Sequence, residues 1–176
     1  VILLNQLSKT MDFKRKHFEI VKKRVEEPRK FIQVISGPRQ IGKTTLALQL
    51  CKEITIPYHF VSADSVISNQ NVWIEQQFES VRIKMKSGNF SEYLLIIDEV
   101  QKISNWGEYI KAEWDKDTRL KNNIKLILLG SSRLLLQQGL TESLTGRFEL
   151  TLMEHWSFSE MKNSFGFTIE EYIWFG

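Results

Sequence analysis

Cysteine, proline and long apolar runs are scarce in this chain of 176 residues. Its one cysteine, Cys51, excludes a disulfide framework, and no cysteine and histidine group has the spacing of a zinc site. The longest apolar runs, Tyr93 to Ile97 and Leu126 to Leu129, are far shorter than the ~20 residues of a membrane span. We therefore expect a globular protein of a reducing compartment, the cytoplasm, with no membrane partner.

The formal net charge of +3 comes from one segment near the N-terminus. Lys9 to Lys30 holds nine basic and four acidic residues, so the rest of the chain is slightly acidic. Phe18, Val21 and Val25 recur at helical spacing within it and predict an amphipathic helix that leads toward Pro28. Its basic side chains form either an ordinary solvated face or a surface for DNA phosphates, and the sequence leaves both interpretations open.

Short apolar segments alternate with helical ones along the chain. The expected strands are 31–36, 58–62, 93–97, 124–129 and 148–153, and the expected helices between them are 43–53, 71–86 and 106–119. Continuous apolar strands indicate a parallel sheet buried on both faces, because a sheet with one wet face alternates polar and apolar residues. The fold class is therefore α/β, with helices on both sides of the sheet.

A glycine-rich loop follows the first of these strands. Gly37-Pro38-Arg39-Gln40-Ile41-Gly42-Lys43-Thr44 fits G-x-x-x-x-G-K-[ST] and lies between a strand and a helix, as a P-loop requires. The motif predicts that the backbone N–H groups of this loop surround the phosphates. Lys43 is expected on the β and γ phosphates and the Thr44 hydroxyl on Mg²⁺. Thr45 either contacts the α phosphate or is an ordinary residue of the first helical turn.

Two adjacent carboxylates end the third apolar strand, at Asp98 and Glu99. Asp98 suits the water shell of Mg²⁺, and Glu99 suits activation of an attacking water, which favours hydrolysis. A guanine-reading N-K-x-D motif is absent from the sequence, so ATP is the expected nucleotide. Gln101 follows the pair and is a candidate sensor of the nucleotide state.

Four segments occur in the order found in bacterial and archaeal AAA-type ATPases: 37–46, 95–102, 129–132 and 143–149. From roughly Phe13 onwards the chain resembles this family, in particular the AAA+/STAND-like members that often carry a C-terminal domain related to restriction nucleases. The resemblance implies a five-stranded parallel P-loop sheet in the order 5-1-4-3-2, with ligand across the carboxyl ends of its strands.

The same resemblance suggests roles for two later motifs. Ser131 or Ser132 resembles a sensor that hydrogen-bonds the γ phosphate or the attacking water. The alternative is a turn with Ser132 capping a helix that starts at Arg133, and both can hold. Arg147 resembles an arginine that reaches a γ phosphate in its own subunit or in a neighbour of a homo-oligomer. The alternative is a surface arginine in a salt bridge.

These patterns divide the chain into four parts. Residues 1–10 are an upstream remnant if Met11 is the initiator, 11–30 form the basic helix, and 31–155 form the ATPase core. Two capping boxes, at Ser157 and Thr168, predict short helices in 156–176, before a C-terminal region outside this sequence. The apolar residues of the second short helix should pack on the core or on that further material.

The predicted function is Mg-dependent ATP hydrolysis that drives a conformational change in attached domains. The alternatives are a nucleotide-gated switch with little intrinsic hydrolysis and a DNA-associated ATPase.

Overall fold

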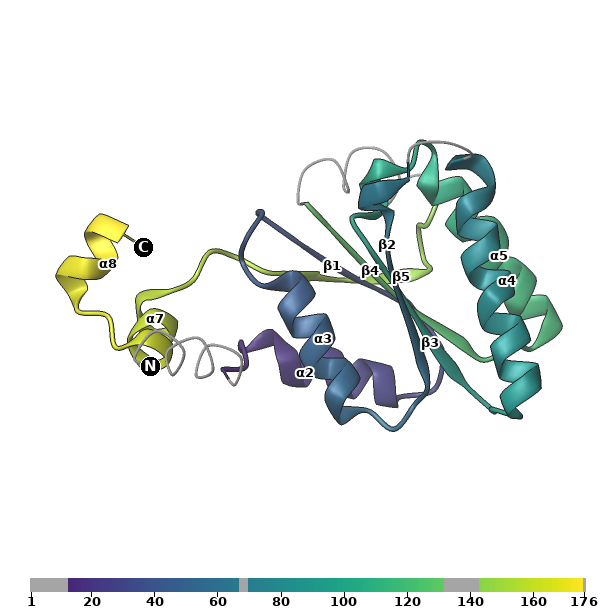
Figure 1. The fold of residues 1–176 in the computed structure, drawn as a ribbon, viewed down its shortest axis with the longest axis horizontal. Helices are drawn as coiled ribbons and strands as arrows, with labels where there is room; N and C mark the ends of the chain where they lie inside the picture. Colours follow the sequence, from purple (N-terminus) through teal and green to yellow (C-terminus); the bar gives the residue numbers. More distant parts are fainter. Residues whose placement is uncertain (1–12, 67–69, 132–142, 176) are drawn as a thin grey trace.

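Five parallel strands form a sheet between two layers of helices (Figure 1). The computed structural model describes residues 13–66, 70–131 and 143–175. Its strands are β1 Ile32–Gly37, β2 Tyr58–Ser62, β3 Tyr93–Asp98, β4 Ile124–Ser131 and β5 Phe148–Leu152. Its α-helices are α2 His17–Glu26, α3 Lys43–Glu53, α4 Gln70–Gly88, α5 Trp106–Leu120, α7 Phe158–Phe165 and α8 Ile169–Phe175, and the 3₁₀ turns are η1 Ala63–Ser65 and η2 Val100–Lys102.

The strands run in the order β2-β3-β4-β1-β5, which confirms the predicted order. All residues of β1 and β3 are buried, as expected of strands covered on both faces. Strand β4 lies between β1 and β3, and its register places Ser131 beside Gly37. The carboxyl ends of β1, β3 and β4 therefore meet at one edge of the sheet.

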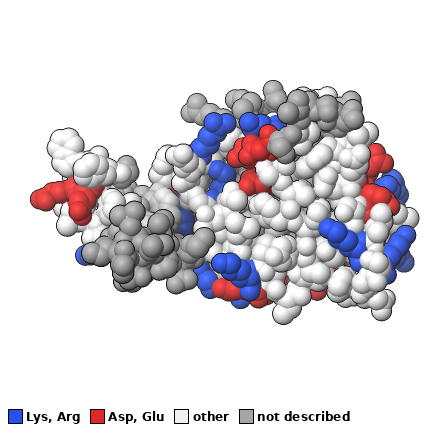
Figure 2. Space-filling view, viewed as in Figure 1, with Lys and Arg blue, Asp and Glu red and all other residues white. Residues whose placement is uncertain are grey.

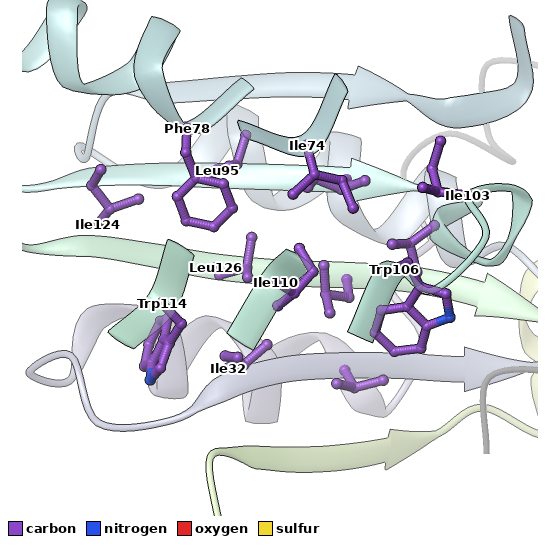
Figure 3. Packing of buried hydrophobic residues seen from close by; sticks show 14 of the residues in the cluster. Ile32, Ile74, Phe78, Leu95, Ile103, Trp106, Ile110, Trp114, Ile124 and Leu126 are labelled. Atoms are coloured by element: carbon purple, nitrogen blue, oxygen red, sulfur yellow. The ribbon is translucent and has the colours of Figure 1, made fainter. Parts of the chain in front are cut away.

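Each face of the sheet has its own apolar core. On one face, α4 and α5 contribute Phe78, Ile110 and Trp114, which pack over buried residues of β1, β3 and β4 (Figure 3). On the other face, α2 and α3 pack together, and Phe18 and Val21 of α2 are completely buried. The helix in the basic segment is thus part of the domain rather than a separate arm.

The two capping boxes form as the sequence predicts. Ser157 caps α7 and exchanges hydrogen bonds with Glu160, and Thr168 and Glu171 do the same at the start of α8. Helix α8 lies away from the sheet in Figure 1, and its Trp174 side chain is 78% exposed. Of the two expected arrangements, packing on the core is therefore not found: the ring contact of α8 is with α7, between Tyr172 and Phe158. The other, packing on material outside this sequence, stays a prediction.

None of the helices within the described residues combines the length and apolarity needed to cross a bilayer.

Candidate nucleotide-binding site

The glycine-rich loop joins the end of β1 to the start of α3, where the sequence predicts it. A Cβ atom on Gly37 would lie 2.1 Å from the carbonyl oxygen of Met153, so only glycine fits there. Gly42 has φ 93° and precedes α3, and Gln40 also has positive φ, at 63°. These left-handed residues turn the chain sharply from strand to helix. The loop therefore has a backbone that a run of ordinary residues would not adopt.

Lys43 is the first residue of α3, and its side chain turns back into the loop. It is only 6% exposed, and its Nζ donates hydrogen bonds to the carbonyl oxygens of Gly37, at 2.9 Å, and Pro38, at 2.5 Å. Burial lowers the pKa of Lys43, while Glu99 and Asp98 act in the opposite direction. A buried ammonium held by carbonyls alone gains strongly from an anion, so the loop suits phosphate.

Asp98 and Thr44 meet although they lie 54 residues apart. The Thr44 hydroxyl donates to Oδ2 of Asp98 at 2.7 Å, and the backbone N–H of Glu99 donates to Oδ1 at 2.8 Å. Asp98 is 5% exposed, so a nearby cation would be held away from bulk water. The structure thus brings together the two residues that the sequence predicts as metal ligands.

Mg²⁺ is commonly held by one or two protein oxygens, with phosphate and water as its remaining ligands. A hydroxyl and a carboxylate beside a phosphate loop fit that requirement. No cluster of three or more His, Cys, Asp or Glu side chains suited to a metal occurs in residues 13–66, 70–131 and 143–175.

Glu99 lies beside Lys43 on the wall of a pocket of about 370 Å³. The pocket is lined by Arg39, Gln40, Gly42, Lys43, Thr44, Thr45 and Glu99. Glu99 has φ 53°, an unusual conformation for a residue with a side chain, and its carboxylate accepts a hydrogen bond from Gln101. Ile41 is the one loop residue whose side chain is buried in the α2–α3 core.

Ser131 ends β4 next to Gly37 and is half-buried, so it lies at the same edge of the sheet as the loop. The other candidates of this motif, Ser132 and Arg133, lie outside the described residues.

Arg147 lies at the amino ends of the strands, opposite the end where the loop lies. It directly precedes β5, and its carbonyl oxygen accepts a hydrogen bond from the N–H of Ile32 at the start of β1. Its guanidinium forms a two-pronged ion pair with Asp115, at 2.9 Å and 3.0 Å. A strand of six residues spans roughly 20 Å, so this arginine does not reach a phosphate on the loop of its own chain. Of the predicted alternatives, the salt bridge describes its position.

One contact of the loop was not predicted. Arg15 donates a hydrogen bond to the carbonyl oxygen of Ile41 at 3.1 Å. No local pattern points to this contact beyond the place of Arg15 in a basic segment, because the other partners of Arg15 lie about 140 residues away.

The strand order, the loop after β1 and the carboxylate pair after β3 define the class of P-loop nucleotide-binding proteins. Comparison with protein families places the chain more closely, since residues 29–162 match the AAA domain. The chain therefore belongs to the AAA domain family of nucleotide-binding, ATPase-type proteins. No curated protein matches it.

Proposed function

We propose that this chain binds Mg-ATP at residues 37–45 and hydrolyses it to ADP and phosphate. The observation that carries the proposal is the convergence of Lys43, Thr44, Asp98 and Glu99 at one edge of the sheet. These four residues come from the two strand ends on either side of β4, which is where a P-loop fold binds its ligand.

In the bound state, we expect Lys43 to exchange its two carbonyl partners for β and γ phosphate oxygens. The backbone N–H groups of the loop and the N-terminus of α3 would hold the remaining phosphate charge. Thr44 and Asp98 would hold Mg²⁺, which supplies positive charge next to the phosphate oxygens. Ser131 is close enough to the loop to serve as the proposed sensor of the γ phosphate.

Glu99 is the proposed general base. The oxygen of a water forms a bond to the γ phosphorus while the bond to the ADP oxygen breaks, and the proton of the water passes to the Glu99 carboxylate. Gln101 donates a hydrogen bond to one oxygen of this carboxylate, which keeps acceptor capacity for the proton. Gln101 therefore belongs to the proposed reaction as the residue that orients Glu99.

Turnover would drive movement of domains attached to this core, in the cytoplasm. A role for Arg147 in this scheme requires a neighbouring copy of the chain, and its ion pair with Asp115 would have to open first. Such an arginine would make hydrolysis depend on assembly into a homo-oligomer.

Phosphate release by the wild type and by Glu99→Gln tests the proposal, with ATP binding measured on both. Glu99→Gln keeps the size of the side chain and removes the base, so we expect full ATP binding and a loss of turnover of at least about 100-fold. ATP binding without phosphate release by the wild type, alone or assembled, would instead favour a nucleotide-gated switch. Absence of ATP binding by the wild type would reject both functions.

A further inference from the structure

Arg15 is the most heavily engaged charged side chain beside the loop. It precedes α2, is 4% exposed, and all five N–H donors of its guanidinium have acceptors. Two of them bind the carboxylate of Glu160 at 3.0 Å each, and the others reach the carbonyl oxygens of Ile41, Glu154 and His155. The guanidinium also lies 4.7 Å from the ring centre of Trp156.

The Ile41 carbonyl lies at a sensitive point of the loop. It belongs to the same planar peptide as the N–H of Gly42, and in a trans peptide the two groups point in opposite directions. Because Arg15 holds the oxygen, it also fixes the direction of the Gly42 N–H. Gly42 lines the pocket, so Arg15 orients one of the loop donors without touching a ligand itself.

Glu160 in turn holds Arg15. Glu160 lies in the first turn of α7, where it also accepts hydrogen bonds from the backbone and hydroxyl of Ser157. The chain between β5 and α7 passes directly over the loop, since Met153 donates to the carbonyl of Ser36 at 2.7 Å and packs against Gly37. Helix α7 therefore connects to the loop through Arg15, at the end of the molecule shown on the left of Figure 1.

We propose that Arg15 is a positioning residue that fixes the glycine-rich loop through Ile41 and is itself fixed by Glu160 on α7. We call this chain of contacts, from Glu160 through Arg15 to Ile41, the tie. If the chain binds ATP as proposed above, the tie makes ATP affinity depend on Glu160, although that residue lies outside the pocket. By reciprocity of linked equilibria, bound ATP steadies α7 to the same degree. A nucleotide event at the loop then reaches the C-terminal helices through Arg15.

Hydrogen exchange of the ligand-free protein tests the tie independently of ATP. The variants are Arg15→Met, which keeps the length of the side chain, and the milder Glu160→Gln. Arg29→Met is the matched control, because Arg29 also binds two carbonyls and stacks on a tryptophan, but at the other edge of the sheet. Exchange of the amides of residues 39–43, measured relative to α4, should accelerate about tenfold in the two test variants. If the exchange rate of the loop in both test variants stays within twofold of its rate in Arg29→Met, the proposal is overturned.

Calorimetric titration with Mg-ATP gives the second readout. We expect the Kd to rise about tenfold in Arg15→Met and severalfold in Glu160→Gln, within the usual range of coupling between sites. Arg29→Met should lower the Tm and leave the Kd unchanged. A Kd within twofold of wild type in both test variants overturns the link to the nucleotide. Faster loop exchange in a protein whose wild type binds no ATP would support the tie and reject the proposed function.

Discussion

The Thr44 hydroxyl and the Asp98 carboxylate are joined by a hydrogen bond of 2.7 Å that links the first turn of α3 to the end of β3. Because β4 separates β1 from β3, this bond crosses the edge of the sheet over the end of an intervening strand. Both oxygens are of the kind that Mg²⁺ prefers. A metal bound at this place would have its charge compensated by the Asp98 carboxylate.

Replacement of Asp98 by asparagine should remove the dependence of ATP binding on Mg²⁺. The amide retains an oxygen for the Thr44 hydroxyl but lacks the charge that attracts the cation. For the wild type we expect the ATP Kd to be about tenfold lower with Mg²⁺ than with EDTA, a difference of about 1.4 kcal/mol. In Asp98→Asn the two Kd values should agree. Glu75→Gln, an exposed change on α4, is the control and should behave as wild type. A full Mg²⁺ effect in Asp98→Asn would contradict the assignment.

Lys43→Ala should abolish the stabilisation of the protein by ATP. A ligand at about 100 times its Kd stabilises the folded state by about 2.7 kcal/mol, which raises the Tm by several degrees in a chain of this size. The variant loses the ammonium that we expect on the β and γ phosphates and should show no shift. Lys52→Ala, on the exposed face of the same helix, should retain the shift. An equal ATP shift in wild type and Lys43→Ala would remove the loop from the binding site.

The sequence predicts most of the fold because its signals are local. The apolar runs of β1, β3 and β4 are continuous. The loop contains Gly42, whose left-handed φ few other residues adopt, and Gly37, where a side chain would clash with Met153. The position of Arg147 is different, since its motif suggests a phosphate contact while its place directly before a parallel strand puts it at the amino edge of the sheet. The motif alone predicts that Arg147 contacts phosphate, but the direction of β5 excludes that contact for a site in the same chain.

Long-range polar contacts account for what the sequence does not predict. The Ser157 capping box identifies Glu160 as a capping residue. The same carboxylate also binds Arg15, 145 residues earlier, and no local pattern encodes that pair. The exposed position of α8 is likewise a tertiary property, because its apolar composition alone suggested burial.

Binding of DNA should be weak. Within the described part of the basic segment, Lys14 and Lys22 pair with Glu53, Arg24 pairs with Glu27 and Glu149, and Arg15 is buried. Basic and acidic side chains adjoin each other on the face shown in Figure 2, instead of forming one continuous basic surface. We expect no binding of duplex DNA at about 150 mM salt in a fluorescence anisotropy titration. Binding that weakens steeply from 50 to 200 mM salt would revive the DNA-associated alternative.

The thiol of Cys51 should report on the stability of α3. Cys51 is 7% exposed, and burial raises the pKa of its thiol to about 11. At pH 8 its thiolate fraction is about 100-fold below that of an ordinary cysteine, so alkylation by iodoacetamide should be slower by at least that factor than in urea-unfolded protein. Mg-ATP should slow it further, because α3 begins at the loop and must open to expose the thiol. Lys43→Ala should remove the nucleotide effect, and rapid labelling of the folded wild type would contradict the buried position.

Glu160 should make the stability of the domain sensitive to acid. Burial alone would raise the pKa of Glu160, but hydrogen bonds from Arg15 and Ser157 outweigh it and lower the pKa to about 2, from 4.5 in the unfolded chain. Between these two values the unfolded state binds more protons than the folded state, so the contribution of Glu160 is complete above pH 4.5 and is lost as the pH falls toward 2.

Urea unfolding of wild type and Glu160→Gln at several pH values measures this contribution. At pH 7 the variant should be less stable by about 3 kcal/mol, since each unit of pKa shift corresponds to about 1.4 kcal/mol. The difference should shrink steadily below pH 4.5 and nearly vanish near pH 2. Glu171→Gln removes the corresponding glutamate of the α8 capping box, whose described hydrogen bonds are to Thr168 and not to an arginine. That control should therefore cost much less at pH 7. A stability difference for Glu160→Gln that stays constant from pH 7 to pH 2.5 would show that shape, and not the charge of the carboxylate, holds Arg15 in place.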